Sequence, residues 1–390
     1  MTVPAGADVV VVGAGVMGAS VAFHLAEAGA DVVVLERDEP AQGSSGKPVG
    51  GVRAQFSDPL NVALGHRSLA AYADFARRPG ADIGLRRVGY LFLLPTEADV
   101  ELFRGSVAVQ NALGVGSRLV DLDEALTLNP YLDRDAYAGA AFSAEDGWAR
   151  PAAVVQGYLD GARALGARVL SRTEVLGVDR SGERVTGVRT AAGTVATGTV
   201  VCCAGAWSQG LGAMVGVDLP VVPLRRQIAF TGPPPPTGRP RAPLPFTIDF
   251  GSTFYVHDAG DGPDAGLLLG IADPATAPGF GRDYDESWLP TLRAAARRCT
   301  PALADLPVTS GWAGLYEMTP DHDALVGEAA GVDRFLYAAG FSGHGFLQAP
   351  AVGEVVRDLV LGVTPATDVT PLHADRFAGV RPVRAEANII

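Results

Sequence analysis

Short β-branched runs alternate with a helix-like stretch along the first fifty residues. Val9–Val12 is an uninterrupted apolar run, which is typical of a strand buried on both faces. Ala19–Ala28 then spaces its apolar residues as a helix does, and Gly29 is the stop signal that ends it. A second strand is predicted at Asp31–Leu35, with Glu36 directly after it. The pattern therefore predicts a strand, a helix and a second strand, the order of a parallel βαβ unit.

A glycine-rich turn joins the first strand to the helix, with the spacing G-x-G-x-x-G. Gly13 permits the tight turn, Gly15 lets a pyrophosphate approach the backbone, and Gly18 lets the helix pack closely on the strand. The helix N-terminus offers free N–H groups to phosphates, and the acid after the second strand suits an adenosine ribose. The unit therefore predicts a dinucleotide site formed by Gly13, Gly15, Val16, Met17, Gly18, Glu36 and Arg37.

Further strands and helices are predicted downstream. Pro151–Gly166 keeps its apolar residues on one side, which predicts a helix. Arg168–Val201 alternates like a strand meander, and Thr231–Pro245 is rich in Pro and Gly, which predicts a loop or an edge connection. Four more runs are predicted to be strands of one sheet: Gly89–Pro95, Val221–Thr231, Thr247–His257 and Gly266–Ile271.

Composition and charge narrow the class of protein. A length of 390 residues predicts two or three domains. Hydrophobic residues make up 48% and charged residues 19%, which is enough apolar material for a large core and too little charge for disorder. The 31 basic and 43 acidic residues give a net charge of −12. Nucleic acid is therefore not expected as a partner, because phosphate binding needs a basic face.

Membrane, disulfide and metal roles are not supported by the sequence. The apolar run Val9–Ala26 is shorter than a membrane span and contains the glycine turn, and no positive charge precedes it as in a signal peptide. The three cysteines, Cys202, Cys203 and Cys299, have neither a disulfide framework nor the ligand spacing of a zinc site. The sequence therefore predicts a soluble, cytoplasmic globular protein with no metal and no membrane partner.

Four segments resemble, in the same order, motifs of FAD-dependent amine oxidoreductases of the D-amino-acid oxidase superfamily. The first is GSSGK at Gly43–Lys47, followed by GGVRAQF, and the last is GFSGHGF at Gly340–Phe346. Between them lie a strand-to-AGAW turn at Thr199–Trp207 and a TPD segment at Trp312–Asp321. The most similar branch contains sarcosine oxidase, dimethylglycine dehydrogenase and the β-subunits of amino-acid dehydrogenases.

The resemblance implies a fold of mixed α/β and α+β class, of the glutathione-reductase type. In such a fold a Rossmann-type FAD-binding domain is interleaved with a mixed-sheet substrate domain. The expected boundaries are 1–85, 146–215 and 319–375 for the FAD-binding domain, 86–145 and 216–318 for the substrate-binding domain, and 376–390 for a C-terminal tail.

The resemblance also implies FAD as the cofactor, bound noncovalently. Gly314 stands where monomeric sarcosine oxidase attaches its flavin through a cysteine, and no histidine stands in Gly43–Arg53, where dimethylglycine-type enzymes carry theirs. Beyond the glycine turn, the residues expected to contact FAD are Ser44, Ser45, Gly46, Val175, Ala204, Gly205, Trp207, Gly340, Gly343, His344, Gly345 and Phe346.

The implied reaction is oxidation of the C–N bond of an amino acid or N-alkyl amino acid, of a sarcosine-, proline- or glycine-like kind. A hydride passes to flavin N5, the resulting imine hydrolyses, and O2 reoxidises the flavin to give H2O2. Two alternatives stay open, a dehydrogenase that uses a protein or quinone acceptor, and an FAD-binding β-type subunit active only in a hetero-oligomer. An electron-acceptor protein and a homo- or hetero-oligomer therefore stay open as partners, besides the small-molecule amine substrate.

Arg53 is the predicted substrate contact. It falls where sarcosine oxidases keep an arginine for the substrate carboxylate, and a guanidinium binds a carboxylate through two parallel hydrogen bonds. The family's second carboxylate ligand, a lysine, is replaced by Leu347. Tyr255 and His257, on a predicted strand, are further candidates for contact with the carboxylate or the amine.

Two more residues are candidates for a part in the chemistry. The backbone N–H groups of the Gly343–Phe346 turn suit negative charge on the reduced flavin. His344, in that turn, is interpreted as a packed or capping residue ahead of a catalytic one. The family's oxygen-activating lysine is replaced by Leu268. Lys47, the only lysine in the chain, follows the flavin loop and is a candidate to supply that charge, against the alternative of an ordinary solvated lysine.

Overall fold

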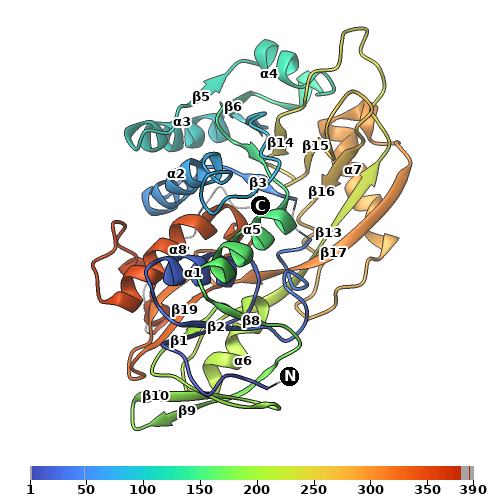
Figure 1. Cartoon of the computed structure of the whole chain (residues 1–390). Coiled ribbons are helices and arrows are strands. Elements are labelled where there is room, and N and C mark those ends of the chain that lie inside the picture. The colour runs from blue at the N-terminus through green and yellow to red at the C-terminus, as the bar shows by residue number, and fades with distance from the viewer. Residues whose placement is uncertain (1, 48, 379–385, 387–390) are drawn as a thin grey trace.

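Two large β-sheets organise the chain (Figure 1). The computed structural model describes residues 2–47, 49–378 and 386. The six-stranded sheet has the order β18 (Leu325–Glu328), β19 (Phe335–Ala339), β12 (Val200–Cys202), β1 (Val9–Val12), β2 (Val32–Leu35) and β8 (Arg168–Leu170). Its neighbouring strands are parallel, except that β18 is antiparallel to β19. Segments far apart in the sequence thus share one sheet, which confirms the predicted fold class.

The predicted βαβ unit lies at the centre of this sheet. β1 coincides with the predicted strand, and helix α1 (Val16–Glu27) leads to β2. Val9 and Val11 face the cluster that includes α1, whereas Val10 and Val12 face a second cluster. That second cluster includes residues of the three-stranded sheet of β9 (Val175–Ser181), β10 (Arg184–Thr190) and β11 (Gly193–Ala196). This sheet confirms the middle of the predicted meander, whereas its two ends, Arg168–Leu170 and Val200–Val201, are strands of the six-stranded sheet. An apolar run without alternation is thus buried on both faces.

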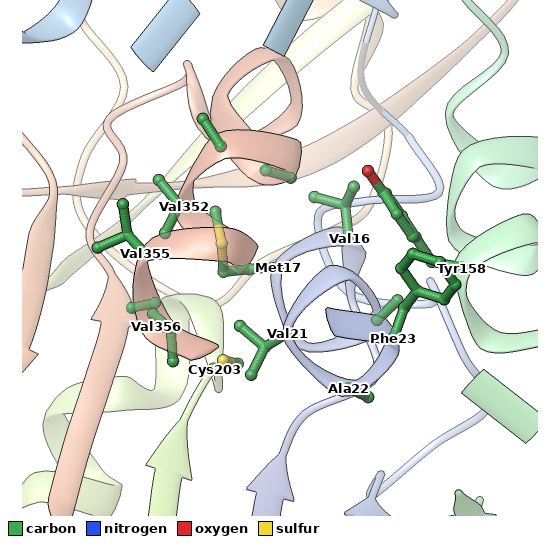
Figure 2. Close-up of a cluster of buried hydrophobic side chains, with 14 of the residues drawn as sticks. Val16, Met17, Val21, Ala22, Phe23, Tyr158, Cys203, Val352, Val355 and Val356 are labelled. Carbon is green, nitrogen blue, oxygen red and sulfur yellow. The ribbon is translucent and has the colours of Figure 1, made fainter. Parts of the chain in front are cut away.

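Helix α1 is clamped between two other helices, α8 (Gly345–Leu361) and α5 (Pro151–Ala164). Figure 2 shows Met17 and Val21 beside valines of α8, and Phe23 on the opposite side beside Tyr158 of α5. The Phe23 and Tyr158 rings lie 5.6 Å apart. On the α8 side, the Ser20 hydroxyl donates to the Ala349 carbonyl at 2.8 Å. This clamp fixes the N-terminus of α1, where the glycine turn lies.

The eight-stranded sheet holds all four of the predicted downstream runs. Its order is β17 (Val308–Met318), β13 (Val222–Thr231), β16 (Leu267–Gly270), β15 (Tyr255–Asp258), β14 (Phe246–Asp249), β4 (Tyr90–Leu94), β6 (Gly139–Ser143) and β5 (Ser117–Val120). One expectation needs correction, because Thr247–His257 is not one strand but the two strands β14 and β15. The Asp249 carboxylate accepts hydrogen bonds from the Gly251 amide at 3.0 Å and the Ser252 hydroxyl at 2.5 Å, which turns the chain between them.

The two faces of the eight-stranded sheet have different neighbours. Leu91 and Leu93 of β4 point to the face covered by α7 (Leu289–Cys299), whereas Tyr90 and Phe92 point to the opposite, aromatic face. That aromatic face looks toward the six-stranded sheet. The other α-helices of the described residues are α2 (Pro59–Ala73), α3 (Glu97–Ala112), α4 (Leu122–Leu128) and α6 (Ser208–Ala213). Two short strands, β3 (Gly51–Val52) and β7 (Gly147–Trp148), pair with each other. In the sequence, each lies between a strand of the six-stranded sheet and a strand of the eight-stranded sheet.

Two absences hold for the part of the chain that the structure describes. No helix there is long and apolar enough to cross a membrane. No group of three or more His, Cys, Asp or Glu side chains there is arranged to hold a metal ion. Cys202, Cys203 and Cys299 are buried free thiols.

Candidate active site

Two adjoining cavities lie where the two sheets meet. The turn cavity is lined by the glycine turn, the ends of β1 and β2, the Thr173–Val175 segment and the Ala204–Trp207 turn. The sheet cavity is lined by the aromatic face of the eight-stranded sheet and by the GFSGHGF turn. Five residues line both cavities: Val16, Ser44, Ser45, Glu317 and Gly345. One elongated ligand can therefore occupy both cavities.

The glycine turn is shaped for close approach of a ligand to the backbone. Gly13 has φ of +107°, and a Cβ on it would lie 2.3 Å from the Cys203 carbonyl oxygen. A Cβ on Gly15 would lie 2.9 Å from the Ser45 hydroxyl, which accepts a hydrogen bond from the Val16 amide at 2.9 Å. The GSSG segment thus closes over the start of α1. The N-terminal end of that helix favours an anionic group here.

The acid after β2 has a role in building the turn. The Glu36 carboxylate accepts hydrogen bonds from the Ala14 amide at 2.7 Å and the Asp38 amide at 2.8 Å. Glu36 also lines the turn cavity, where the prediction places a ribose. Next to it, the Arg37 guanidinium lies 4.3 Å from the centre of the Trp207 ring, which forms part of the same wall.

The structure brings most of the predicted flavin contacts to these two walls. The predicted residues on the turn cavity are Gly13, Gly15, Val16, Met17, Glu36, Arg37, Ser44, Ser45, Val175, Ala204, Gly205, Trp207 and Gly345. Gly343, His344 and Phe346 line the sheet cavity instead. Gly18, Gly46 and Gly340 line neither, and a Cβ on each would lie 2.5 Å or less from a neighbouring atom. These three glycines serve the packing of the turns.

Arg53 is on the sheet cavity and deeply buried. Its guanidinium lies 4.3 Å from the centre of the Phe56 ring and 5.4 Å from that of Phe92, and Nη1 donates to the Gln55 carbonyl. Burial lowers the pKa of Arg53, and the nearby Tyr90, Glu386 and Asp146 act in the opposite direction. Burial also raises the pKa of Asp146 to about 7. A buried guanidinium in this setting is well suited to bind a carboxylate.

The two strand residues proposed as substrate contacts differ in their position relative to the sheet cavity. Tyr255 lines the sheet cavity, whereas His257 does not. The His257 ring stacks on Phe246 at 4.6 Å and lies 5.8 Å from Trp148, and its Nδ1 pairs with the Asp258 carbonyl at 2.7 Å. Burial lowers the pKa of His257 to about 4. Substrate contact at His257 stays a prediction, and neighbouring rings enclose this histidine, which is not among the lining residues of the sheet cavity.

His344 is a neutral buried ring on the cavity wall. Its centroid lies 5.7 Å from that of Phe56 and 6.0 Å from that of Phe341. Neither ring nitrogen has a hydrogen-bond partner among the described residues. Burial, with the nearby Arg53, lowers the pKa of His344 to about 3. The packed interpretation fits these contacts, and the two unpartnered nitrogens are available to a ligand.

Lys47 faces the sheet cavity from the loop after the GSSG segment. Its backbone carbonyl accepts a hydrogen bond from the Trp312 indole at 2.9 Å. Its Cβ approaches Gly314, where an added Cβ would lie only 3.3 Å away. No ion pair involves the Lys47 amine within the described ranges. Because Gly314 has no side chain, Lys47 can pack closely against it at the cavity wall.

Several residues of this site were not singled out from the sequence. Arg226 on β13 and Tyr316 on β17 line the sheet cavity, with the guanidinium carbon 5.5 Å from the centre of the tyrosine ring. Tyr90, Ile228, Phe246 and Ile248 complete the wall. The available signal for Arg226 is a pair of arginines inside an otherwise apolar strand run, Val221–Thr231. Strand alternation predicts that one of the pair points to each face, but not which one.

The turn that carries GFSGHGF is held by an acid at the junction of the cavities. The Glu317 carboxylate accepts a hydrogen bond from the Gly340 amide at 3.2 Å, and burial raises its pKa to about 7. Leu347 lines the sheet cavity, and Leu268 is buried in the sheet next to it. The two leucines therefore bring no charge to the positions where the family's lysines are expected.

The residues present fit a dinucleotide with an aromatic ring system. A Cβ on Gly13 or Gly15 would overlap with a neighbouring atom, so the backbone of the turn is left open to a ligand. The buried Ser44 hydroxyl between the two cavities has no partner in the described part of the chain. The turn cavity would hold the adenosine and pyrophosphate groups of FAD, and the junction at Ser44, Ser45, Glu317 and Gly345 would receive its ring end.

Known proteins are similar to this chain over nearly its whole length. A family model for FAD-dependent oxidoreductases matches residues 8–359. Mitochondrial dimethylglycine dehydrogenase of Rattus norvegicus is 27% identical over 389 residues, which cover 95% of this chain and 45% of that protein. Glycine oxidase of Geobacillus kaustophilus is 29% identical over 384 residues, which cover 95% of this chain and 97% of that one. The chain thus spans less than half the length of the dimethylglycine dehydrogenase.

A solved structure extends the comparison to three dimensions. The crystal structure of L-proline dehydrogenase from P. horikoshii matches with a TM-score of 0.89 at 30% identity. The match covers 96% of this chain and 99% of the other.

Proposed function

The chain belongs to the family of FAD-dependent oxidoreductases, as its four motifs predicted, and from this premise we propose that it oxidises the C–N bond of an amino acid or N-alkyl amino acid. The observation that carries the proposal is the junction of the two cavities, which sets a dinucleotide turn beside a pocket with a buried guanidinium. FAD, when bound, supplies the acceptor for the two electrons that leave the amine. The protein must then bind and orient the amine.

The sheet cavity supplies the groups for that task. Arg53 would hold the substrate carboxylate, since two parallel hydrogen bonds from a guanidinium fix both position and orientation. Tyr90, Tyr255 and Tyr316 line the same wall, and their hydroxyl groups would contact the carboxylate or the amine. Burial raises the pKa of each tyrosine, so all three remain neutral hydrogen-bonding groups at neutral pH. His344 is likewise neutral there and would accept or donate one hydrogen bond.

The cofactor is proposed to be bound noncovalently. Gly314 has no side chain with which to attach a flavin. Cys203, on the turn cavity, is a buried thiol whose pKa is raised well above its ordinary value by burial, so it is a poor nucleophile. Denaturation of the yellow protein with acid or heat is expected to release all of its flavin into the supernatant. Flavin that stays with the precipitated chain would refute noncovalent binding.

O2 is the proposed electron acceptor, with a protein or quinone acceptor as the alternative. Lys47, which lines the sheet cavity and makes no ion pair with the described residues, supports O2, because a cation near the flavin stabilises the anion formed when O2 takes up an electron. The replacement of the family's lysine by Leu268 supports the alternative. A complete set of cavity-lining groups within one chain favours activity without a partner subunit.

The test is an anaerobic titration of the purified yellow protein with primary and secondary amino acids, followed by admission of air. Bleaching by one compound and rapid recovery in air with H2O2 are expected. Bleaching that persists in air would show a dehydrogenase that requires another acceptor. Absence of bleaching by every amino acid in the panel would refute the proposed reaction for the isolated chain.

A further inference from the structure

The wall of the sheet cavity carries more positive charge than one carboxylate needs. Three cations line it, Lys47, Arg53 and Arg226, in a chain whose net charge is −12. Among the described residues that line the wall, the only carboxylate is Glu317, which accepts a hydrogen bond from a backbone amide, and the Glu386 and Asp146 carboxylates lie near Arg53. A low-dielectric cavity lined by one sign of charge concentrates ligands of the opposite sign. The cavity therefore selects for anionic ligands.

Two of these cations reach the cavity from different segments of the chain. Arg226 belongs to β13, where it is in register with Gly314 of the edge strand β17. Arg53 lies over Phe92 of β4. Three strands, β16, β15 and β14, separate β13 from β4. At about 4.8 Å per strand, the two strand axes are about 19 Å apart, and the Tyr255 side chain lies on the wall between them. The two guanidinium groups have different aromatic neighbours at the cavity, Phe56 and Phe92 for Arg53 and Tyr316 for Arg226.

Arg226 lacks the partners that a structural arginine normally has. Its Nη1 makes one long hydrogen bond, 3.5 Å, to the Asp273 carbonyl, and its buried Nε has no partner among the described residues. None of the carboxylates there lies within the 4.0 Å of an ion pair from it. The preceding residue, Arg225, differs: it donates to the Asp283 carbonyl at 3.1 Å and pairs with Asp285 at 3.9 Å. A partly buried guanidinium with no ion pair among the described residues, at a cavity wall, can pair with an anionic ligand.

We infer that Arg226 forms a second anion subsite, so that the preferred substrate is an amine that carries two carboxylates, one bound by Arg53 and the other by Arg226. Secondary amines with a carboxylate on each N-substituent and amino dicarboxylic acids belong to this class. The inference rests on the proposed function, since it names the substrate class of the same cavity. The amine nitrogen would then lie between the two arms, over the floor strands that carry Tyr255 and Ile228.

Two thioethers that lack the amine test this subsite without turnover. (Methylthio)acetate has one carboxylate, and thiodiacetate has the same skeleton with a carboxylate at each end. Binding to the FAD-loaded protein is followed by calorimetry and by the change in the flavin absorption spectrum. Thiodiacetate is expected to bind roughly tenfold or more tightly than (methylthio)acetate, the gain of one charge-assisted pair.

The variants Arg226→Gln and Arg225→Gln separate the subsite from general charge effects. Arg226→Gln is expected to remove the preference for thiodiacetate and to leave the affinity for (methylthio)acetate within about threefold of wild type. Arg225→Gln removes the same charge from the neighbouring position on the same strand and is expected to retain the preference.

Each remaining outcome has a distinct meaning. Equal affinity of the wild-type protein for both thioethers would overturn the second subsite and leave the proposed function standing. A loss of affinity for both compounds in Arg226→Gln would also overturn it, because Arg226 would then hold the single carboxylate. If neither thioether binds, the carboxylate-binding role of the cavity fails, and the proposed function fails with it. The wild-type comparison stands whether or not a variant folds.

Discussion

Substitution of Gly18 by alanine tests whether the packing of α1 on β1 sets the affinity for FAD. A Cβ at Gly18 would lie 1.9 Å from the Gly13 carbonyl oxygen, and 3.3 Å from the Cys203 Cβ. The Cβ and the Gly13 carbonyl oxygen must move about 1.5 Å apart to reach an ordinary contact of 3.4 Å. Because the carbonyl is backbone and belongs to the turn itself, no rotamer change can relieve the overlap, and α1 must move away from the turn.

The size of the effect follows from the cost of closing the displaced turn again when FAD binds. Overpacking of this kind costs about 3 kcal/mol at the upper end of the usual range. The preference of a helix for alanine over glycine, about 1 kcal/mol, stabilises the folded protein equally with and without FAD and does not change binding. Because the displaced turn must close to hold the pyrophosphate, the dissociation constant for FAD is expected to rise on the order of 100-fold.

The assay is titration of the flavin-free protein with FAD, followed by quenching of flavin fluorescence. Gly105→Ala in α3 is the matched control, because an added Cβ there meets no atom within 4 Å and the site is exposed. That variant is expected to bind FAD as the wild type does and to unfold at the same or a higher temperature. An FAD affinity of Gly18→Ala within twofold of the control would refute the reasoning.

Three further predictions concern the sheet cavity. Arg53→Met is expected to weaken binding of (methylthio)acetate tenfold or more, measured by calorimetry; unchanged affinity would place the carboxylate elsewhere. The pKa of Asp146 is raised from its ordinary 3.8 to about 7, so its ionisation is unfavourable in the folded state and stability is lost as pH rises from about 4 to 7. Asp146→Asn is expected to flatten this part of the curve of unfolding free energy against pH. An unaltered slope would contradict this expectation. Lys47→Met is expected to slow flavin reduction or reoxidation in stopped-flow measurements; if both rates match wild type, Lys47 is an ordinary loop lysine.

The nucleotide-binding half of the molecule was predictable because its signals are local. Val9–Val12, the glycine turn and Asp31–Leu35 are consecutive, and each residue type there is required by the backbone that it forms. The run Thr247–His257 shows the limit of such signals. Its strand-like composition hid a turn that depends on hydrogen bonds to the Asp249 side chain.

The sheet cavity was less predictable because distant strands build it. Arg226 and Tyr316 become neighbours through pairing of β13 with β17, about ninety residues apart in the chain. Alternation places Tyr255 and His257 on one face of β15, but whether each reaches the cavity depends on rings contributed by other strands. Phe246 and Trp148 enclose His257, and no local pattern in the sequence indicates that contact.

The position of Lys47 on the cavity wall has a practical consequence for chemical labelling. Since the chain has no other lysine, an acylating reagent has a single side-chain amine to attack, and it belongs to a residue that lines the sheet cavity. Mass spectrometry of the acylated chain would therefore report on cavity occupancy in the natural sequence, with a bound carboxylate slowing the modification. Coupling to an amine-reactive surface would, for the same reason, attach the protein through the candidate active site or an α-amino group, so immobilised samples would lose the access that binding measurements need.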